Sequence, residues 1–163
     1  MLFVWDIRQA SPELLATARA IVTQSTGREK DRKTPGIGNF LLAEITHTLW
    51  RQTKLPVLPQ IEVELAESLQ GENRFLSAFT ANETTDGVST MAWNTYTVAE
   101  LQKKWLEAHT IPLCVILVAS PIHMVRSKWV YERLGFTVLP ATVPKGCYFN
   151  ERQDQWWLRR TAG

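Results

Sequence analysis

Hydrophobic and polar residues follow two different spacings along the chain, and these spacings predict strands and helices in turn. Short apolar or β-branched runs predict strands over residues 2–7, 56–63, 74–79, 111–119 and 136–139. Apolar residues three or four positions apart predict helices over residues 11–22, 39–49, 62–69, 94–106, 121–134 and 151–160. Strands that alternate with helices are typical of a mostly parallel sheet with helices on both faces. We therefore predict a single α/β domain over residues 1–163, built as a three-layer α/β/α sandwich.

The first predicted helix begins at a capping signal. Ser11 is placed as the N-cap, and Pro12 takes the first helical position, where its missing N–H leaves no donor unpaired. The apolar residues that follow, as far as Ile21 and Val22, lie on one helical stripe. We therefore expect this helix to run through Val22.

Composition and charge narrow the possible partners. Hydrophobic residues make up 45% of the chain, and the formal net charge is only +2, from 18 basic and 16 acidic residues. Proteins that bind nucleic acid or a membrane surface through charge carry a larger basic excess. We therefore expect no nucleic-acid partner, and a small molecule is the more natural ligand.

No segment predicts a membrane span or a secretory signal. The longest apolar runs fall well short of the roughly 18 residues that a spanning helix needs, and Asp6 interrupts the apolar start of the sequence. We expect a cytoplasmic protein, unless an N-terminal anchor precedes this sequence.

The sequence contains no recognisable metal or redox motif. Cys114 and Cys147 have neither metal-ligand nor redox spacing, and Cys114 lies in an apolar run where we expect it to be inert core. Glu44 and His47 form one Glu-x-x-His pair, but a di-metal helix site needs a second pair. No cofactor is predicted from these residues.

The polar break after the strand at 111–119 is the strongest candidate site. Ser120 is placed as a helix N-cap, and His123 falls in the first turn. The N–H groups and dipole of that turn favour an anion and disfavour a protonated imidazole, so His123 is expected to be neutral. Arg126, one turn further along, can direct its guanidinium at the same anion. The alternative is that Ser120 only caps the helix and His123 is an ordinary polar residue.

Two other helix starts are weaker candidates. Asn94 and Thr95 open the helix at 94–106 and can offer polar groups to a ligand, or Asn94 can be a plain cap. Gly36 and Gly38 precede another helix and permit close backbone approach to a phosphate. The glycine spacing matches neither a dinucleotide-binding fingerprint nor a Walker loop.

Two carboxylates and one charged segment are the remaining candidate site features. Glu62 follows a predicted strand and can serve as a general base, although such a residue more often is solvated or caps a helix. Asp6 is the other candidate partner carboxylate. The charged segment 26–33 predicts a solvent-exposed loop, with a basic clamp for a ligand as the functional alternative.

Part of this pattern resembles the YdcF-like family, a domain of unknown function that includes the SanA and ElyC envelope proteins. The resemblance covers roughly residues 88–140. The positions that match the family's two motifs and its strand ending are Asn94, Thr95, Ala99, Ser120, His123, Met124, Arg126 and residues 134–140. Two departures stand out: residues 5–8 lack the family's first glycine-rich turn, and Pro35 to Gly38 alone correspond to its second.

The resemblance implies a Rossmann-like fold with a ligand pocket at the strand ends. It also suggests S-adenosylmethionine binding or a role in cell-envelope metabolism. Our first hypothesis is an enzyme, a hydrolase or transferase, acting on a small anionic or nucleotide-like ligand, in which His123 exchanges a proton. Ser120 binds the anion, and Arg126 and Asn94 orient it. The rival hypotheses are a non-catalytic cofactor-binding module and a degenerate, envelope-associated member of the family. The sequence predicts no oligomeric state.

Overall fold

The computed structural model describes residues 10–70, 77, 94–141 and 143–144 of the 163-residue chain. The predicted strand at 2–7, the predicted tail helix at 151–160 and most of the predicted strand at 74–79 lie outside these residues. Asp6 and Cys147 lie outside them too.

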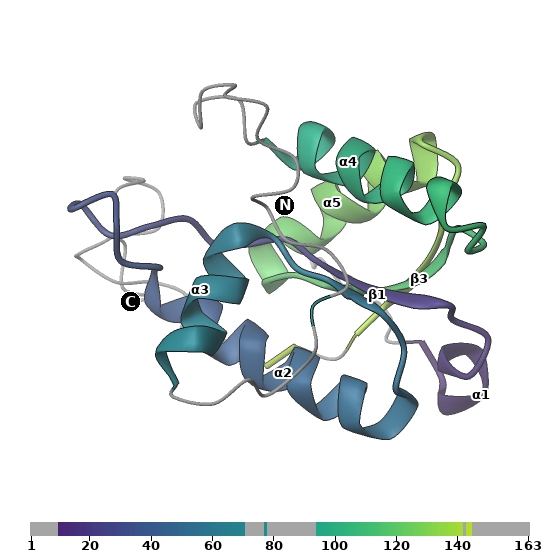
Figure 1. Cartoon of the computed structure of the whole chain (residues 1–163), viewed down its shortest axis with the longest axis horizontal. Coiled ribbons are helices and arrows are strands. Elements are labelled where there is room, and N and C mark those ends of the chain that lie inside the picture. The colour runs from purple at the N-terminus through teal and green to yellow at the C-terminus, as the bar shows by residue number, and fades with distance from the viewer. Residues whose placement is uncertain (1–9, 71–76, 78–93, 142, 145–163) are drawn as a thin grey trace, which may run out of the picture.

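The described residues form helices and one parallel sheet (Figure 1). In chain order the elements are α1 (Pro12–Leu15), β1 (Ala20–Thr23), α2 (Ile37–Thr53), β2 (Val57–Leu58), α3 (Ile61–Leu69), α4 (Thr95–Ala108), β3 (Cys114–Val118), α5 (Pro121–Arg133) and β4 (Thr137–Pro140). All the strand pairings are parallel, and the strand order is β2-β1-β3-β4. The predicted α/β fold with a parallel sheet is confirmed.

The strand order places a topological switch point between β1 and β3. From β1 the chain passes to β2 on one side, and β3 and then β4 add on the other side. Thr23 of β1 is in register with Val118 of β3, so the two strands end together. In open α/β sheets, ligands bind outside the carboxyl ends of strands at such a point.

Helices cover both faces of the sheet, because the side chains of its central strands alternate between two cores. Ile21 and Ile116 pack in the core that contains Leu42 of α2. Val22 and Leu117 belong to the opposite core, which also contains residues of α4 and α5. Figure 1 shows α4 and α5 over one face and α2 and α3 over the other. Burial on both faces explains why these strands are almost continuously apolar.

The predicted helix over residues 11–22 is wrong beyond its first turn. Ser11 caps α1 as expected, accepting a hydrogen bond from the Leu14 N–H at 3.3 Å, but the helix ends at Leu15. Ile21 and Val22 lie instead in β1, where both are fully buried. A β-branched pair fits a strand between two cores better than one helical face.

The remaining helices begin close to the predicted residues. Asn94 caps α4, and Ser120 and Pro121 begin α5 directly after the loop from β3. Gly135, with φ +94°, lies between α5 and β4 in a backbone conformation that favours glycine. Cys114 is half-buried at the first position of β3, at the margin of the core.

Candidate functional site

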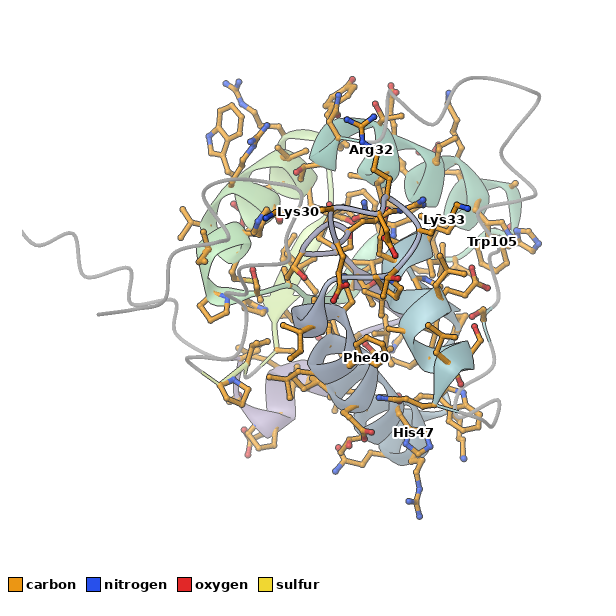
Figure 2. The ribbon with its side chains drawn as sticks, turned by 90° about the vertical axis from the view of Figure 1, so that its left-hand side faces the viewer. Lys30, Arg32, Lys33, Phe40, His47 and Trp105 are labelled. Atoms are coloured by element: carbon orange, nitrogen blue, oxygen red, sulfur yellow. The ribbon has the colours of Figure 1, made fainter. Side chains whose placement is uncertain are left out.

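The loops that follow β1 and β3 leave the sheet side by side at its carboxyl edge. The Gln24 N–H donates to the Val118 carbonyl at 2.9 Å, which extends the pairing of the two strands by one residue. Residues 24–27 and 119–120 therefore start from neighbouring positions. Figure 2 views the molecule from this side, with Lys30, Arg32 and Lys33 labelled on the loop that follows β1.

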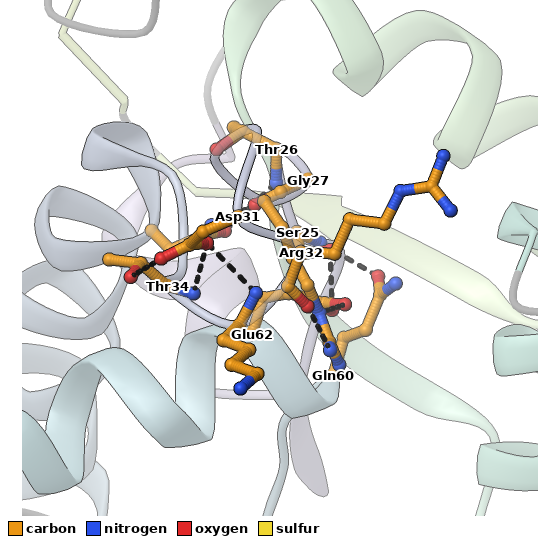
Figure 3. A network of polar contacts seen from close by, with 11 residues as sticks. Ser25, Thr26, Gly27, Asp31, Arg32, Thr34, Gln60 and Glu62 are labelled. Carbon is orange, nitrogen blue, oxygen red and sulfur yellow. Dashed lines mark hydrogen bonds and ion pairs between the residues drawn. The ribbon is translucent and has the colours of Figure 1, made fainter. Parts of the chain in front are cut away.

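Ser25, on the loop after β1, is held by two side chains at the beginning of α3. Its N–H donates to Gln60 Oε1 at 2.8 Å, and its hydroxyl donates to Glu62 Oε2 at 2.9 Å. Arg28 Nε donates to the other carboxylate oxygen of Glu62 at 3.0 Å. Figure 3 shows Ser25 with Gln60 and Glu62. Both oxygens of Glu62 are therefore engaged, and the predicted general base acts in this structure as a positioning residue for the loop.

Gly36 and Asn39, at the beginning of α2, hold the same loop from the other side. The Thr26 N–H donates to Asn39 Oδ1 at 2.9 Å, and Asn39 Nδ2 donates to the Gly27 carbonyl at 2.7 Å. The Gly36 N–H donates to that carbonyl as well, at 3.0 Å. Gly36 and Gly38 are both buried. At Gly36 the close backbone approach that the sequence predicts is thus made to the loop after β1.

Four buried polar atoms have no hydrogen-bond partner among the described residues. They are Thr26 Oγ1, Ser120 Oγ, His123 Nε2 and Ser127 Oγ. Thr26 follows β1, Ser120 follows β3, and positions 120, 123 and 127 fall on one face of α5. Buried hydroxyls are almost always hydrogen-bonded, so these unsatisfied ones are candidates for contact with a water molecule or a ligand.

Ser120 occupies the N-cap position of α5 without capping it. The Ser120 carbonyl accepts from the His123 and Met124 N–H groups at 3.0 and 2.9 Å, but the hydroxyl makes no cap hydrogen bond. The side chain is completely buried. The alternative in which Ser120 serves only as a cap therefore does not describe its hydroxyl, which has no hydrogen-bond partner among the described residues.

Burial lowers the pKa of His123 below its usual 6.5, and the positive charge of Arg126 lowers it further. The imidazole is therefore neutral at pH 7, with one nitrogen as a donor and the other as an acceptor. Arg126 is exposed on α5, about one turn after His123 and nearly two turns after Ser120. Three of the predicted site residues thus lie within the first two turns of one helix.

Asn94 and Thr95 also begin a helix that starts on this side of the sheet, because α4 leads back to the amino end of β3. Asn94 Oδ1 accepts from the Thr97 N–H at 2.9 Å and from the Thr97 hydroxyl at 3.2 Å. Its oxygen is therefore occupied by capping. Thr95 is half-buried at the first helical position.

A buried network of three side chains supports the first residue after β1. Gln24 Nε2 donates to the Tyr131 hydroxyl at 2.8 Å, and that hydroxyl donates to Gln102 Oε1. Gln102 Nε2 in turn donates to the Leu58 carbonyl at 2.8 Å. Burial raises the pKa of Tyr131 far above its usual value, so its hydroxyl stays protonated. The network ties β1 and β2 to α4 and α5 beneath the carboxyl edge.

The sequence does not predict Gln24, Ser25 or the Thr26 hydroxyl as site groups, because the apolar spacing before them favours a helix over the strand β1. The available signal was the polar run from Gln24 to Gly27 directly after a β-branched run. Glu62 and His123 come from helices on opposite faces of the sheet, and no hydrogen bond joins these two described residues.

Metal and membrane features are absent from the described part of the chain. It contains no group of three His, Cys, Asp or Glu side chains able to hold a metal ion. None of its helices has the length and apolar character needed to cross a membrane.

In comparisons with known proteins, no family model, curated protein or solved structure matches this chain. The resemblance to the YdcF-like family therefore rests on the motif residues quoted above.

Proposed function

We propose that the protein binds a small anionic ligand, a phosphorylated compound, at the carboxyl edge of the sheet between β1 and β3. The observation that carries this proposal is the pair of fully buried, unpartnered hydroxyls of Thr26 and Ser120 at the ends of these two strands. Each hydroxyl can donate one hydrogen bond, and phosphate oxygens accept several.

The charges around this edge favour an anion over a cation. The positive end of the α5 dipole lies at Ser120, and Arg126 adds a positive charge six residues further along the same helix. Glu62, the buried carboxylate that the sequence singled out, already accepts from Ser25 and Arg28. A phosphate at this position replaces the missing partners of the hydroxyls without meeting an unpaired negative charge.

His123 is the titratable group of the proposed site. Whether its imidazole transfers a proton distinguishes an enzyme from a binding module. As a neutral imidazole it can take a proton from a nucleophile, as a hydrolase or transferase requires, and removing such a group typically lowers the rate by about 10²- to 10⁴-fold. A non-catalytic module uses the same nitrogen only as a hydrogen-bonding group. Turnover of a bound phosphate ester separates the two.

With this function, we infer that the protein is a divergent YdcF-like protein of the cytoplasm. It is supported by the position of Ser120, His123 and Arg126 at the junction of β3 and α5, where the family's motif implies a ligand. S-adenosylmethionine is the alternative ligand, and the screen described next includes it.

The test is a thermal-unfolding screen of the purified chain against phosphate, nucleotides, sugar phosphates and S-adenosylmethionine. A ligand at 100 times its Kd adds about 2.7 kcal/mol to the free energy of unfolding, which is a rise of several degrees in Tm. We expect Ser120→Ala and His123→Ala to abolish that rise.

Two variants control for the chemistry of these substitutions. Ser68→Ala removes an exposed serine hydroxyl that bonds only within α3, and His109→Ala removes an exposed imidazole at the end of α4. Both should retain the wild-type response. A rise in Tm that survives in Ser120→Ala and His123→Ala, or no rise with any phosphorylated ligand, refutes the proposed site.

A further inference from the structure

The charged segment after β1 is a structured hairpin loop. We call residues 28–35 the basic hairpin loop. Arg28 and Pro35 form an antiparallel bridge, and the Glu29 N–H donates to the Thr34 carbonyl at 2.9 Å. At the tip, Asp31 Oδ1 accepts from the Lys33 and Thr34 N–H groups at 2.9 and 2.8 Å. These bonds fix the shape of a segment that its charge pattern alone predicts to be an exposed loop.

The base of this loop is tied to the candidate site. Arg28 Nε donates to Glu62, the carboxylate that also holds Ser25, and Arg28 Nη1 donates to the Arg32 carbonyl at 3.0 Å. The loop therefore continues directly from the segment that carries the unpartnered Thr26 hydroxyl. A ligand at Thr26 lies next to the base of the loop.

The loop concentrates positive charge at this edge. It contains four basic and two acidic residues, so its net charge of +2 equals that of the whole chain. Lys30, Arg32 and Lys33 are exposed, and no ion pair or side-chain hydrogen bond of theirs is found among the described residues. Asp31, by contrast, is occupied by the turn. Figure 2 shows the three basic residues on the loop that faces the viewer at the carboxyl edge.

We propose that the basic hairpin loop binds a second phosphate, so that the ligand is a diphosphate or another compound with two linked phosphate groups. This inference rests on the proposed function, because the first phosphate occupies the buried hydroxyls of Thr26 and Ser120. A single phosphate bonded to buried, uncharged groups leaves the three exposed cations of the loop unused. A second phosphate, linked to the first, lies beside the protein surface, where water screens its attraction to these three cations only partly.

The experiment compares inorganic phosphate with inorganic pyrophosphate by calorimetric titration of the full chain. The loop variant is the triple substitution Lys30→Gln, Arg32→Gln and Lys33→Gln. Its control, Arg51→Gln, Lys104→Gln and Arg133→Gln, removes three positive charges from exposed positions in the second halves of α2, α4 and α5, away from the helix starts at the carboxyl edge.

We expect the wild-type protein and the control to bind pyrophosphate at least about tenfold more tightly than phosphate, the effect of one charge-assisted hydrogen bond. The loop variant should lose this preference and bind phosphate as the wild type does. Raising the salt concentration should weaken pyrophosphate binding more in the wild type than in the loop variant.

The possible failures are distinguishable. If the wild type binds phosphate and the loop variant keeps the preference for pyrophosphate, the role of the loop is refuted and the proposed function stands. If Ser120→Ala binds pyrophosphate as tightly as the wild type, the loop binds anions without the buried site, and two-point binding is refuted. If the wild type binds neither anion, both proposals are wrong.

Discussion

Replacing Ser120 with alanine should stabilise the free protein, although serine at an N-cap position normally stabilises a helix. The loss of a capping hydroxyl ordinarily costs about 1 kcal/mol. That cost does not apply to Ser120, because its hydroxyl makes no cap hydrogen bond and the side chain is 0% exposed. A buried hydroxyl without a partner destabilises the fold by about 1–3 kcal/mol, and alanine removes this penalty.

The measurement is urea unfolding in ligand-free buffer, with Asn94→Ala as the contrasting variant. Asn94 does cap its helix, accepting from the Thr97 N–H at 2.9 Å, so its loss should lower the free energy of unfolding by about 1 kcal/mol. Thr26→Val repeats the Ser120 test at the end of β1 with almost the same side-chain shape. If Ser120→Ala lowers the free energy of unfolding by about 1 kcal/mol or more, its hydroxyl has a partner within the protein and the reasoning is refuted.

Three further predictions follow from the buried groups. Tyr131→Phe should cost about 1–3 kcal/mol, because two buried glutamines lose their shared partner while the ring stays packed; an unchanged urea midpoint contradicts this. Since the pKa of His123 lies below 6.5 in the folded state, the unfolded chain binds the proton more readily. The contribution of His123 to the free energy of unfolding should therefore be constant above about pH 7 and be lost as the pH drops through 6.5 toward the folded-state pKa; His123→Gln should remove this component, and equal pH profiles exclude it. Glu62→Gln should cost about 1–2 kcal/mol, because the amide cannot accept from both of its donors, whereas the exposed Glu107→Gln should change stability by no more than about 0.5 kcal/mol.

The sequence predicted the junction of β3 and α5 well, because each of its signals is local. Serine and proline mark the helix start, the apolar run before them can only be a strand at that length, and Gly135 marks the turn to β4. Asn94 was likewise identified as a cap from its position alone. The prediction of Ser120, His123 and Arg126 as candidate site residues depends on these local signals.

Predicting β1 and the polar residues that follow it at the carboxyl edge requires knowledge of tertiary contacts. Ile21 and Val22 fit the helical spacing and the strand equally well, and only their burial between two cores decides for β1. Because the spacing predicts a helix as far as Val22, it does not place the polar residues after Val22 at the end of a strand. The partners of Gln24 could not be inferred at all, because Tyr131 lies 107 positions further along the chain. Long-range contacts of this kind leave no periodic trace in a single sequence.

The most direct test of the proposed site is a titration of the isotope-labelled chain with inorganic phosphate, followed by the backbone amide signals. The account predicts saturable shifts at the amides of residues 24–27, 120 and 122–124, in the two segments that leave β1 and β3 together, with far smaller changes at the amino ends of these strands. Shifts that do not saturate, or that cluster away from both segments, would contradict an anion site at this edge.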